Sequence, residues 1–369
     1  KTGNRFSPPT RPIRVLGIDL GTTNSTVSEI VWDPADPRVP PARTLEVVQP
    51  TLEGSFTHTL VPSVVALYDG RIFVGEGAKR LRARSAELGL ERNRDLFYEC
   101  KNEIGNRRTY HKAPEGFRSP AEIGGHVVRF LVEAALADDP TPIDRVVVTV
   151  PASFQVAQRH DTMLAIRLAG LEVAGGDLID EPVSAFLDYL SAHRDEGLAL
   201  DQPQSLLVFD FGGGTCDVAV LRIAAQRGGG GIEVAPKAVS RYHRLGGGDL
   251  DRAIVYSELI PALCSENGLG PFDLSFELKK NALEPFLLDV AEGLKTALCS
   301  EIRQLQSFGK YAERRDGFTL VKAVGDTPSP PAEVLDPERA PLADVVRHRV
   351  YVYANPEAEG SPHRLGVFP

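Results

Sequence analysis

The stretch that decides the fold is LLVFDFGGGTCDVAVLRI, residues 206–223. Its apolar run at residues 206–211 predicts a buried strand, residues 212–215 a tight tip, and residues 218–223 a returning strand. Glycine lets the backbone turn sharply with no Cβ in the way, and turn N–H groups with a threonine hydroxyl can then donate to phosphate oxygens. Because such short patterns are common, one hairpin alone leaves a plain structural turn and a phosphate site about equally open.

The same arrangement occurs earlier, in VLGIDLGTTNSTVSEIV, residues 15–31. Here Asp19 ends the first strand and residues 21–24 form the tip. An Asp at this point suits Mg²⁺, usually through the water shell of the ion, because Mg²⁺ dehydrates reluctantly. Two such hairpins predict two similar half-structures whose tips face each other and hold one polyphosphate, with Asp19 and Asp217 near the metal.

Composition limits the class of protein. The chain has 369 residues, enough for two lobes, and 42% hydrophobic with 25% charged residues is typical of a globular protein. The net charge of -9 argues against a nucleic-acid partner. Four scattered cysteines without a CxxC pair favour reduced thiols in the cytoplasm. No apolar run approaches the ~20 residues of a membrane helix and no signal peptide is evident, so we expect no membrane partner. We also expect the chain to be a monomer.

Periodicity and turn signals place the remaining elements. Asp69-Gly70 predicts a tight turn between strands at 61–68 and 71–74. Ser119, Pro120 and Glu122 predict the start of a helix that runs to about Ala137. A buried strand is expected at 145–150, a glycine turn at 245–250, helices at 76–104, 154–168, 183–192, 251–264 and 284–300, and further strands at 318–324 and 349–353.

Several of these stretches together resemble a known family, the nucleotide-binding domain of the seventy-kilodalton heat-shock chaperones of the DnaK type. The matching motifs occur in family order at residues 17–25, 61–63, 74–75, 148–152, 181–182, 209–215 and 245–251. The resemblance covers roughly residues 13–301. It implies an α/β, actin-like ATPase fold of two lobes, each built on a ribonuclease-H-like mixed sheet, with ATP in the cleft between them.

The resemblance also implies a domain plan. Residues 13–200 are expected to be lobe I, with an inserted subdomain at about 33–117, and residues 1–12, which hold three prolines among polar residues, are expected to be a flexible tail. Residues 201–301 are expected to be lobe II, with a subdomain from about 246. Residues 302–369 are expected to be a diverged or partial end of lobe II.

The family's roles transfer where residues match. Lys101 is expected to position the attacking water with Asp210 or Thr215, and Pro151 to act as a hinge. Asp19 and Glu181 are expected to take part in catalysis and, with Asp217, to contact Mg²⁺ mostly through water. The expected ATP or ADP contacts are Gly21, Thr22, Thr23, Asn24, Gly212, Gly213, Gly214, Thr215, Gly246, Gly247, Glu292 and Lys295.

Plain structural roles stay open for some of these residues. Lys101 is alternatively a solvated surface lysine, Glu181 the end of a strand, and Glu292 with Lys295 an ordinary pair on a helix surface. Residues 79–94 are read as a solvated helix face, and alternatively as a docking surface for a co-chaperone or nucleotide-exchange factor.

Two departures from the family concern the adenosine side. Thr296 stands where the family has an arginine that stacks on adenine, and no Gly-Gly-x-x-Arg-x-Pro loop follows residue 301. Truncation, a frame change and divergence all fit. The expected function is a Mg-ATP-binding, slowly ATP-hydrolysing domain whose nucleotide state sets lobe closure. A non-hydrolysing nucleotide-binding scaffold or sensor is the alternative, and a sugar kinase or actin-like filament protein of the same fold is a third reading.

Overall fold

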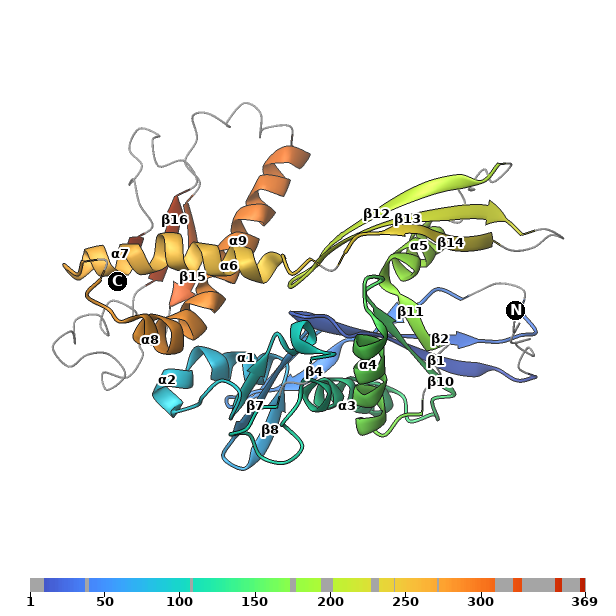
Figure 1. Cartoon of the computed structure of the whole chain (residues 1–369), viewed down its shortest axis with the longest axis horizontal. Helices are drawn as coiled ribbons and strands as arrows, with labels where there is room; N and C mark the ends of the chain where they lie inside the picture. The colour runs from blue at the N-terminus through green and yellow to red at the C-terminus, as the bar shows by residue number, and fades with distance from the viewer. Residues whose placement is uncertain are drawn as a thin grey trace. The chain divides into compact units, whose positions relative to one another are not determined.

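The structure is a computed structural model that describes residues 10–36, 40–106, 109–172, 177–193, 202–226, 232–241, 243–270, 272–308, 321–326, 349–353 and 366–368. The chain divides into two compact units (Figure 1), the first made of Lys1–Lys79 and Asn93–Gly246, the second of Arg80–Arg92 and Gly247–Pro369. Most of the predicted tail lies outside the described residues. The unit boundary falls after Gly246, where the sequence predicts a subdomain, and the lobe division at residue 200 stays a prediction.

The first unit is built on a mixed sheet of six strands among the described residues. Its central path is β11-β10-β1-β2-β3, and β6 pairs with β2. Strand β1 is parallel to β10 and antiparallel to β2, so the first predicted hairpin is confirmed. The strand bounds are β1 (Ile13–Asp19), β2 (Asn24–Trp32), β3 (Arg43–Thr44), β6 (Val61–Pro62), β10 (Arg145–Val150) and β11 (Leu178–Asp180).

Helices α3 (Pro120–Asp138) and α4 (Val156–Leu168) pack against each other beside this sheet (Figure 1). The predicted start of α3 is confirmed, because Ser119 Oγ accepts from Glu122 N while Glu122 Oε2 accepts from Ser119 N. Glycine permits the close crossing: a Cβ on Gly125 would lie 3.1 Å from Ala165 O. The sheet residues Leu16 and Ile18 are buried in the core that α3 completes.

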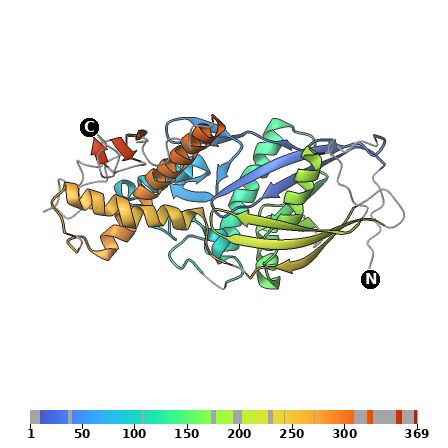
Figure 2. The same ribbon diagram turned by 90° about the horizontal axis from the view of Figure 1, so that it is seen from above.

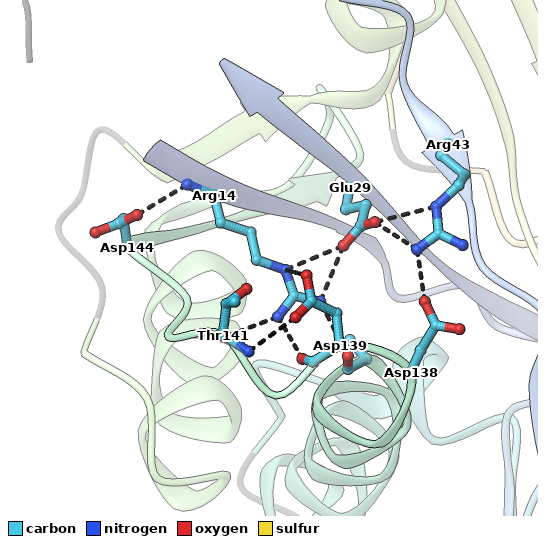
Figure 3. Close-up of polar contacts among 8 residues, drawn as sticks. Arg14, Glu29, Arg43, Asp138, Asp139, Thr141 and Asp144 are labelled. Carbon is cyan, nitrogen blue, oxygen red and sulfur yellow. Dashed lines mark hydrogen bonds and ion pairs between the residues drawn. The ribbon is translucent and has the colours of Figure 1, made fainter. Parts of the chain in front are cut away.

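The end of α3 is fastened to β1 and β2 by Arg14, whose side chain is 4% exposed (Figure 3). Its Nε and Nη2 donate to Glu29 Oε2 at 3.0 and 2.9 Å. The remaining donors reach the carbonyl of Ala135 in the last turn of α3 and the carbonyls of Asp139 and Thr141, which follow the helix. All five guanidinium donors are used, which makes a buried charge tolerable.

A smaller sheet, β8-β7-β9, and the ribbon β4-β5 complete the first unit. Asp69 and Gly70 have φ values of 49° and 68° and form the predicted turn between β7 and β8. The bounds are β4 (Val47–Pro50), β5 (Ser55–His58), β7 (Val64–Tyr68), β8 (Arg71–Val74) and β9 (Leu96–Tyr98).

The predicted continuous helix at 76–104 is wrong. The structure has two short helices, α1 (Glu76–Ala83) and α2 (Ser85–Leu88), then β9 and the 3₁₀ turn η1 (Cys100–Glu103). Gly89 ends α2 with φ at 66°, a conformation that suits glycine. Leu96 to Tyr98 is fully buried and pairs with β7, so a local charged and periodic pattern gives way to pairing with a distant strand.

The second predicted hairpin is confirmed as β12 (Gln204–Phe211) and β13 (Cys216–Ala225), with β14 (Ile232–Val239) added on the far side. Helix α5 (Glu181–Ala192) packs on this sheet and on β10 and β11, as Figures 1 and 2 show. The expectation that residues 206–211 form a strand buried on both faces is wrong. One face packs on α5, but Leu207 and Phe209 on the other are 64% and 63% exposed.

The second unit is mainly helical. Helix α6 (Gly247–Ile254), the π-helical turn η3 (Val255–Leu259) and α7 (Ile260–Glu266) run on as one long helix (Figure 2). They pack on α9 (Glu284–Ser307) through an apolar core that includes Leu259, Leu263, Leu287 and Ala291. The predicted glycine turn at 245–250 is shorter than expected, because α6 already begins at Gly247.

The other elements of this unit are α8 (Phe276–Leu278), η4 (Lys279–Leu283), β15 (Val321–Asp326), β16 (Arg349–Tyr353) and β17 (Gly366–Phe368). The last three form an antiparallel sheet, in which β16 matches the strand expected at 349–353.

Candidate phosphate-binding site

The tips of the two hairpins lie in direct contact within the first unit. A Cβ on Gly213 would be 1.8 Å from Thr23 Oγ1, and one on Gly214 would be 2.4 Å from Thr22 Cγ2. Real Cβ atoms do not approach other atoms so closely, so any larger residue at either glycine would push the tips apart. Two segments nearly 190 positions apart in the sequence are therefore neighbours, as the duplicated pattern predicts.

The hydroxyl groups of Ser25 and Ser63 hold the first tip in place. Ser63 Oγ donates to Gly21 O at 2.8 Å and lies 2.8 Å from Ser25 Oγ, which in turn accepts from Gly21 N. The backbone N–H of Ser63 also donates to Thr23 O. Gly21 has no space for a side chain, since a Cβ there would lie 1.9 Å from Asn24 O. The tip conformation is thus fixed by β6 and the residue after it.

The second tip is closed by its own backbone and by a neighbouring glycine. Gly212 N donates to Thr215 O at 2.9 Å, and Cys216 N donates to His243 O at 3.1 Å. A Cβ on Gly246 would lie 2.5 Å from Gly214 N, so the predicted glycine turn packs directly on this tip.

Lys101 lies beside the tips, in a cluster of carboxylates. Its Nζ is 2.7 Å from Glu181 Oε1, and the two side chains are only 10% and 15% exposed. The negative charges of Asp19 and Asp210 also stabilise its ammonium group and so raise the pKa of Lys101. The structure therefore rules out the reading of Lys101 as a solvated surface lysine. Its neighbour Asn102 accepts from Thr22 Oγ1 at 3.4 Å, which ties this segment to the first tip.

Each hairpin also contributes a carboxylate held by a hydroxyl. Asp19 Oδ1 accepts from Thr149 Oγ1 at 2.8 Å, across the parallel pair of β1 and β10. Asp217 Oδ1 accepts from Ser153 Oγ at 2.6 Å, while its Oδ2 is buried with no partner in the described part of the chain. Asp217 also stands directly opposite Asp210 in the β12–β13 register.

Burial and crowding shift the protonation equilibria of this cluster. Burial raises the pKa of Asp210, and the negative charges of Asp19 and Asp217 raise it further. Burial also raises the pKa of Glu181 against the opposing effect of Lys101. Burial by itself would lower the pKa of Lys101, but Glu181, Asp19 and Asp210 outweigh it and the pKa is raised. Three carboxylates, those of Glu181, Asp19 and Asp210, act on the one ammonium of Lys101, so the cluster carries a net negative charge that favours a cation.

The donor set fits a hydrated magnesium ion and a polyphosphate. Carboxylate oxygens are the ligands that Mg²⁺ prefers, and the orphaned Oδ2 of Asp217 is an acceptor that lacks a donor. Among the described residues, no three His, Cys, Asp or Glu side chains converge as a direct metal site.

Other predicted contacts lie in the second unit. Lys295 Nζ is 2.7 Å from Asp251 Oδ1 and donates to Gly247 O at 3.2 Å, so it fastens α9 to the start of α6. Glu292 precedes it by one turn on α9, and Thr296 Oγ1 donates back to Glu292 O. The structure thus gives Lys295 a structural contact, and its contact with a nucleotide stays a prediction.

The first unit brings together most of the glycines, threonines and carboxylates that were predicted for the two tips. Asn24 begins β2 and pairs with Pro62. Ser63 and Thr149 lie inside the motifs at 61–63 and 148–152 but had no predicted role, and Asn102 and Ser153 had none either. Their contacts join strands and loops that are far apart in the sequence, so no local sequence pattern predicts them.

Comparison of the chain with known proteins shows the family to which it belongs. The family described as Hsp70 protein matches residues 15–306. The chain is 36% identical over 310 residues to the chaperone protein DnaK of Thermus thermophilus, which covers 78% of this chain and 43% of that protein. It is 37% identical over 242 residues to the chaperone protein DnaK of Mycoplasmopsis agalactiae, covering 65% and 34%. The matched region is less than half the length of these relatives.

Paired glycine tips beside a lysine and several carboxylates define a nucleotide-binding domain of the actin-like ATPase class. The chain belongs to the Hsp70 family, as a DnaK-type nucleotide-binding domain. Two further findings concern membrane-spanning helices and disulfide bonds. No helix among the described residues is both long and apolar enough to cross a membrane, and none of the four cysteines forms a disulfide.

Proposed function

We propose that this chain binds Mg·ATP with its two hairpin tips and hydrolyses it slowly to ADP and phosphate. The observation that carries this proposal is the direct contact of Gly213 and Gly214 with Thr22 and Thr23, next to the buried Lys101–Glu181 pair. Backbone N–H groups at glycine tips can approach phosphate oxygens closely, and the neighbouring carboxylates supply the side that faces the cation.

Binding requires the tips to separate. Thr23 and Gly213 are already in contact, so phosphate oxygens can lie between the tips only if the two hairpins move apart. Nucleotide would then hold the hairpins at a spacing that differs from the one they adopt in contact. In this account that change is how nucleotide state sets the closure of the predicted lobes.

The chemistry is the transfer of the γ-phosphoryl group to water. The bond between the γ-phosphorus and the bridging oxygen breaks, a bond to the water oxygen forms, and the proton released by water passes to a nearby base. Asp210 suits that role because its raised pKa makes it a better proton acceptor. Lys101 would align the water with Thr215. Magnesium, held by Asp19, Asp217 and Glu181 mostly through water, would neutralise phosphate charge.

The adenosine side is where the alternative function gains support. Gly246, Gly247, Glu292 and Lys295 are the proposed contacts for the rest of the nucleotide, but Thr296 replaces the arginine expected to stack on adenine. A non-hydrolysing nucleotide-binding scaffold or sensor is therefore the second candidate. A co-chaperone or exchange factor as partner, a cytoplasmic location and a monomeric state remain part of the proposal.

Titration of the purified chain with fluorescent ATP, with and without Mg²⁺, tests binding. We expect saturable 1:1 binding that weakens when Mg²⁺ is removed. Single-turnover hydrolysis then compares wild type with Lys101→Ala and with Lys237→Ala, an exposed lysine on β14 that serves as the control. Loss of hydrolysis in Lys101→Ala alone supports an ATPase. Binding without hydrolysis in the wild type supports the scaffold, and no binding at any Mg²⁺ concentration rejects both functions.

A further inference from the structure

Among the candidate site residues that the structure describes, Asp217 is the one with a fully buried side-chain oxygen that has no hydrogen-bond partner. It is 4% exposed, and only one of its two oxygens has a partner: Oδ1 accepts from Ser153 Oγ at 2.6 Å. The other oxygen, Oδ2, is buried without a hydrogen-bond partner in the described part of the chain. A buried carboxylate oxygen without a partner destabilises the folded state unless a ligand supplies the missing donor.

Ser153 belongs to the loop between β10 and α4, and this loop is held rigidly. Phe154 N donates to Pro151 O at 3.0 Å, and Arg159 Nε donates to Phe154 O at 3.0 Å. The ring of Phe154 is buried against Val150 and Ile104. The backbone on both sides of Ser153 is therefore held by contacts other than the bond to Asp217.

The same segment holds the corresponding carboxylate of the first hairpin. Thr149 is the fifth residue of β10, and its hydroxyl donates to Asp19 Oδ1 at 2.8 Å. Ser153 follows four positions later and holds Asp217 of the second hairpin. One stretch of five residues thus fixes one carboxylate from each hairpin, which sets the two acids relative to each other.

We propose that Ser153 is a positioning residue for magnesium: its hydroxyl holds Oδ1 of Asp217 so that Oδ2 is free to accept from the water shell of the ion. This inference rests on the proposed function. A bond donated to one oxygen fixes the rotation of the carboxylate, and without it the group can turn to satisfy itself elsewhere. Ser153 therefore sets how much Mg²⁺ the nucleotide complex requires, without touching the nucleotide.

The test measures fluorescent ATP binding at fixed nucleotide over a series of Mg²⁺ concentrations. Ser153→Ala should raise the Mg²⁺ concentration for half-maximal binding roughly tenfold, the size expected of one hydrogen bond to a charged group. Binding measured without Mg²⁺ should not change. Ser153→Thr keeps the hydroxyl and should return the Mg²⁺ requirement to within about twofold of wild type. Ser205→Ala, at an exposed serine of β12, is the control.

Thermal melts check that each variant folds, and Ser153→Cys, which is close in size but a weak donor, replaces Ser153→Ala if that variant does not. If wild type binds Mg·ATP and both Ser153→Ala and Ser153→Cys keep its Mg²⁺ requirement, the positioning role is wrong and the proposed function stands. If Ser153→Thr is as impaired as Ser153→Ala, the hydroxyl is not the cause and the role is equally wrong. If wild type binds no ATP at any Mg²⁺ concentration, the proposed function fails and this inference with it.

Discussion

The two hairpins carry the same pattern of residues in different surroundings. Leu16 and Ile18 stand third and first before Asp19, and they are 0% and 1% exposed. Leu207 and Phe209 stand third and first before Asp210, and they are 64% and 63% exposed. The pattern thus determines the strand and its tip, but other parts of the chain determine whether a face is covered. Helix α3 covers the first strand, and no described element covers the corresponding face of the second.

The difference extends to the acids that end the strands. Strand β1 lies between β2 and β10, and β10 supplies the hydroxyl of Thr149 to Asp19. Strand β12 is an edge strand among the described residues, and Asp210 stands opposite a second acid, Asp217. Like charges placed directly opposite each other destabilise a strand pair. The repulsion between Asp210 and Asp217 therefore destabilises the second hairpin in a way that has no counterpart in the first. Such a destabilising arrangement of charges is expected at a binding site.

The largest expected effect is a difference in stability between matched Leu→Ala substitutions in β1 and β12. Leu16→Ala removes a fully buried side chain and should lower the free energy of unfolding by about 2–5 kcal/mol. Leu207→Ala makes the same chemical change at the equivalent position, where the side chain is mostly exposed, and should change it by less than about 0.5 kcal/mol. Urea unfolding followed by circular dichroism measures both. Equal losses would mean that the exposed face of β12 is covered in solution.

A loss on the order of 2 kcal/mol is expected from Lys101→Met, because Glu181 is left buried without its cation. The loss should depend on pH. The pKa of Glu181 is already raised by burial, and removal of Lys101 raises it further. A carboxyl whose folded pKa exceeds its unfolded value costs stability above the folded pKa, and that cost disappears as the pH falls through it.

Lys101→Met should therefore lie closer to wild type at pH 5 than at pH 8 in urea unfolding. The wild type itself should lose the stability contributed by Lys101 only at strongly alkaline pH, since the pKa of this lysine is raised. A loss in the variant that is the same at both pH values would show that Glu181 is not its cause.

The smallest effect, about 1 kcal/mol, should follow Gly213→Ala, which places a Cβ where Thr23 Oγ1 lies. Gly17→Ala, at a glycine of β1 whose added Cβ meets only Ser28 O at 4.0 Å, is the control. Adding Thr23→Gly to Gly213→Ala should restore the lost stability, because the two side chains compete for one space. Additive effects in this double-mutant cycle would argue against contact of the tips in solution.

The sequence predicted the parts of this fold whose causes are local. Ser119 and Glu122 predict the start of α3, because their side chains accept hydrogen bonds from backbone N–H groups of the first turn. Asp69-Gly70 predicts a hairpin turn, because these residue types tolerate the positive φ that the turn needs. The pairing of the tips also followed, since the pattern occurs twice. Residues 96–98 became a strand only through β7, and the exposure of Phe209 depends on what covers β12, so neither could be read locally.

The site divides in the same way. Asp19, Lys101 and Asp210 were found through motifs, but Ser153 was not, because a serine in a loop after a strand is ordinary until the fold brings Asp217 to it. The contact of Lys295 with Asp251 and Gly247 was also hidden, since it joins two helices of the second unit.

The proposed function requires both tips to hold the same nucleotide. Hydrogen exchange measured by mass spectrometry, with and without Mg²⁺ and a non-hydrolysable ATP analogue, tests it most directly. If one nucleotide lies between the tips, peptides covering residues 21–24 and 212–215 should become protected together, at the same nucleotide concentration. Protection of one tip alone, or of neither at saturating analogue, would contradict it.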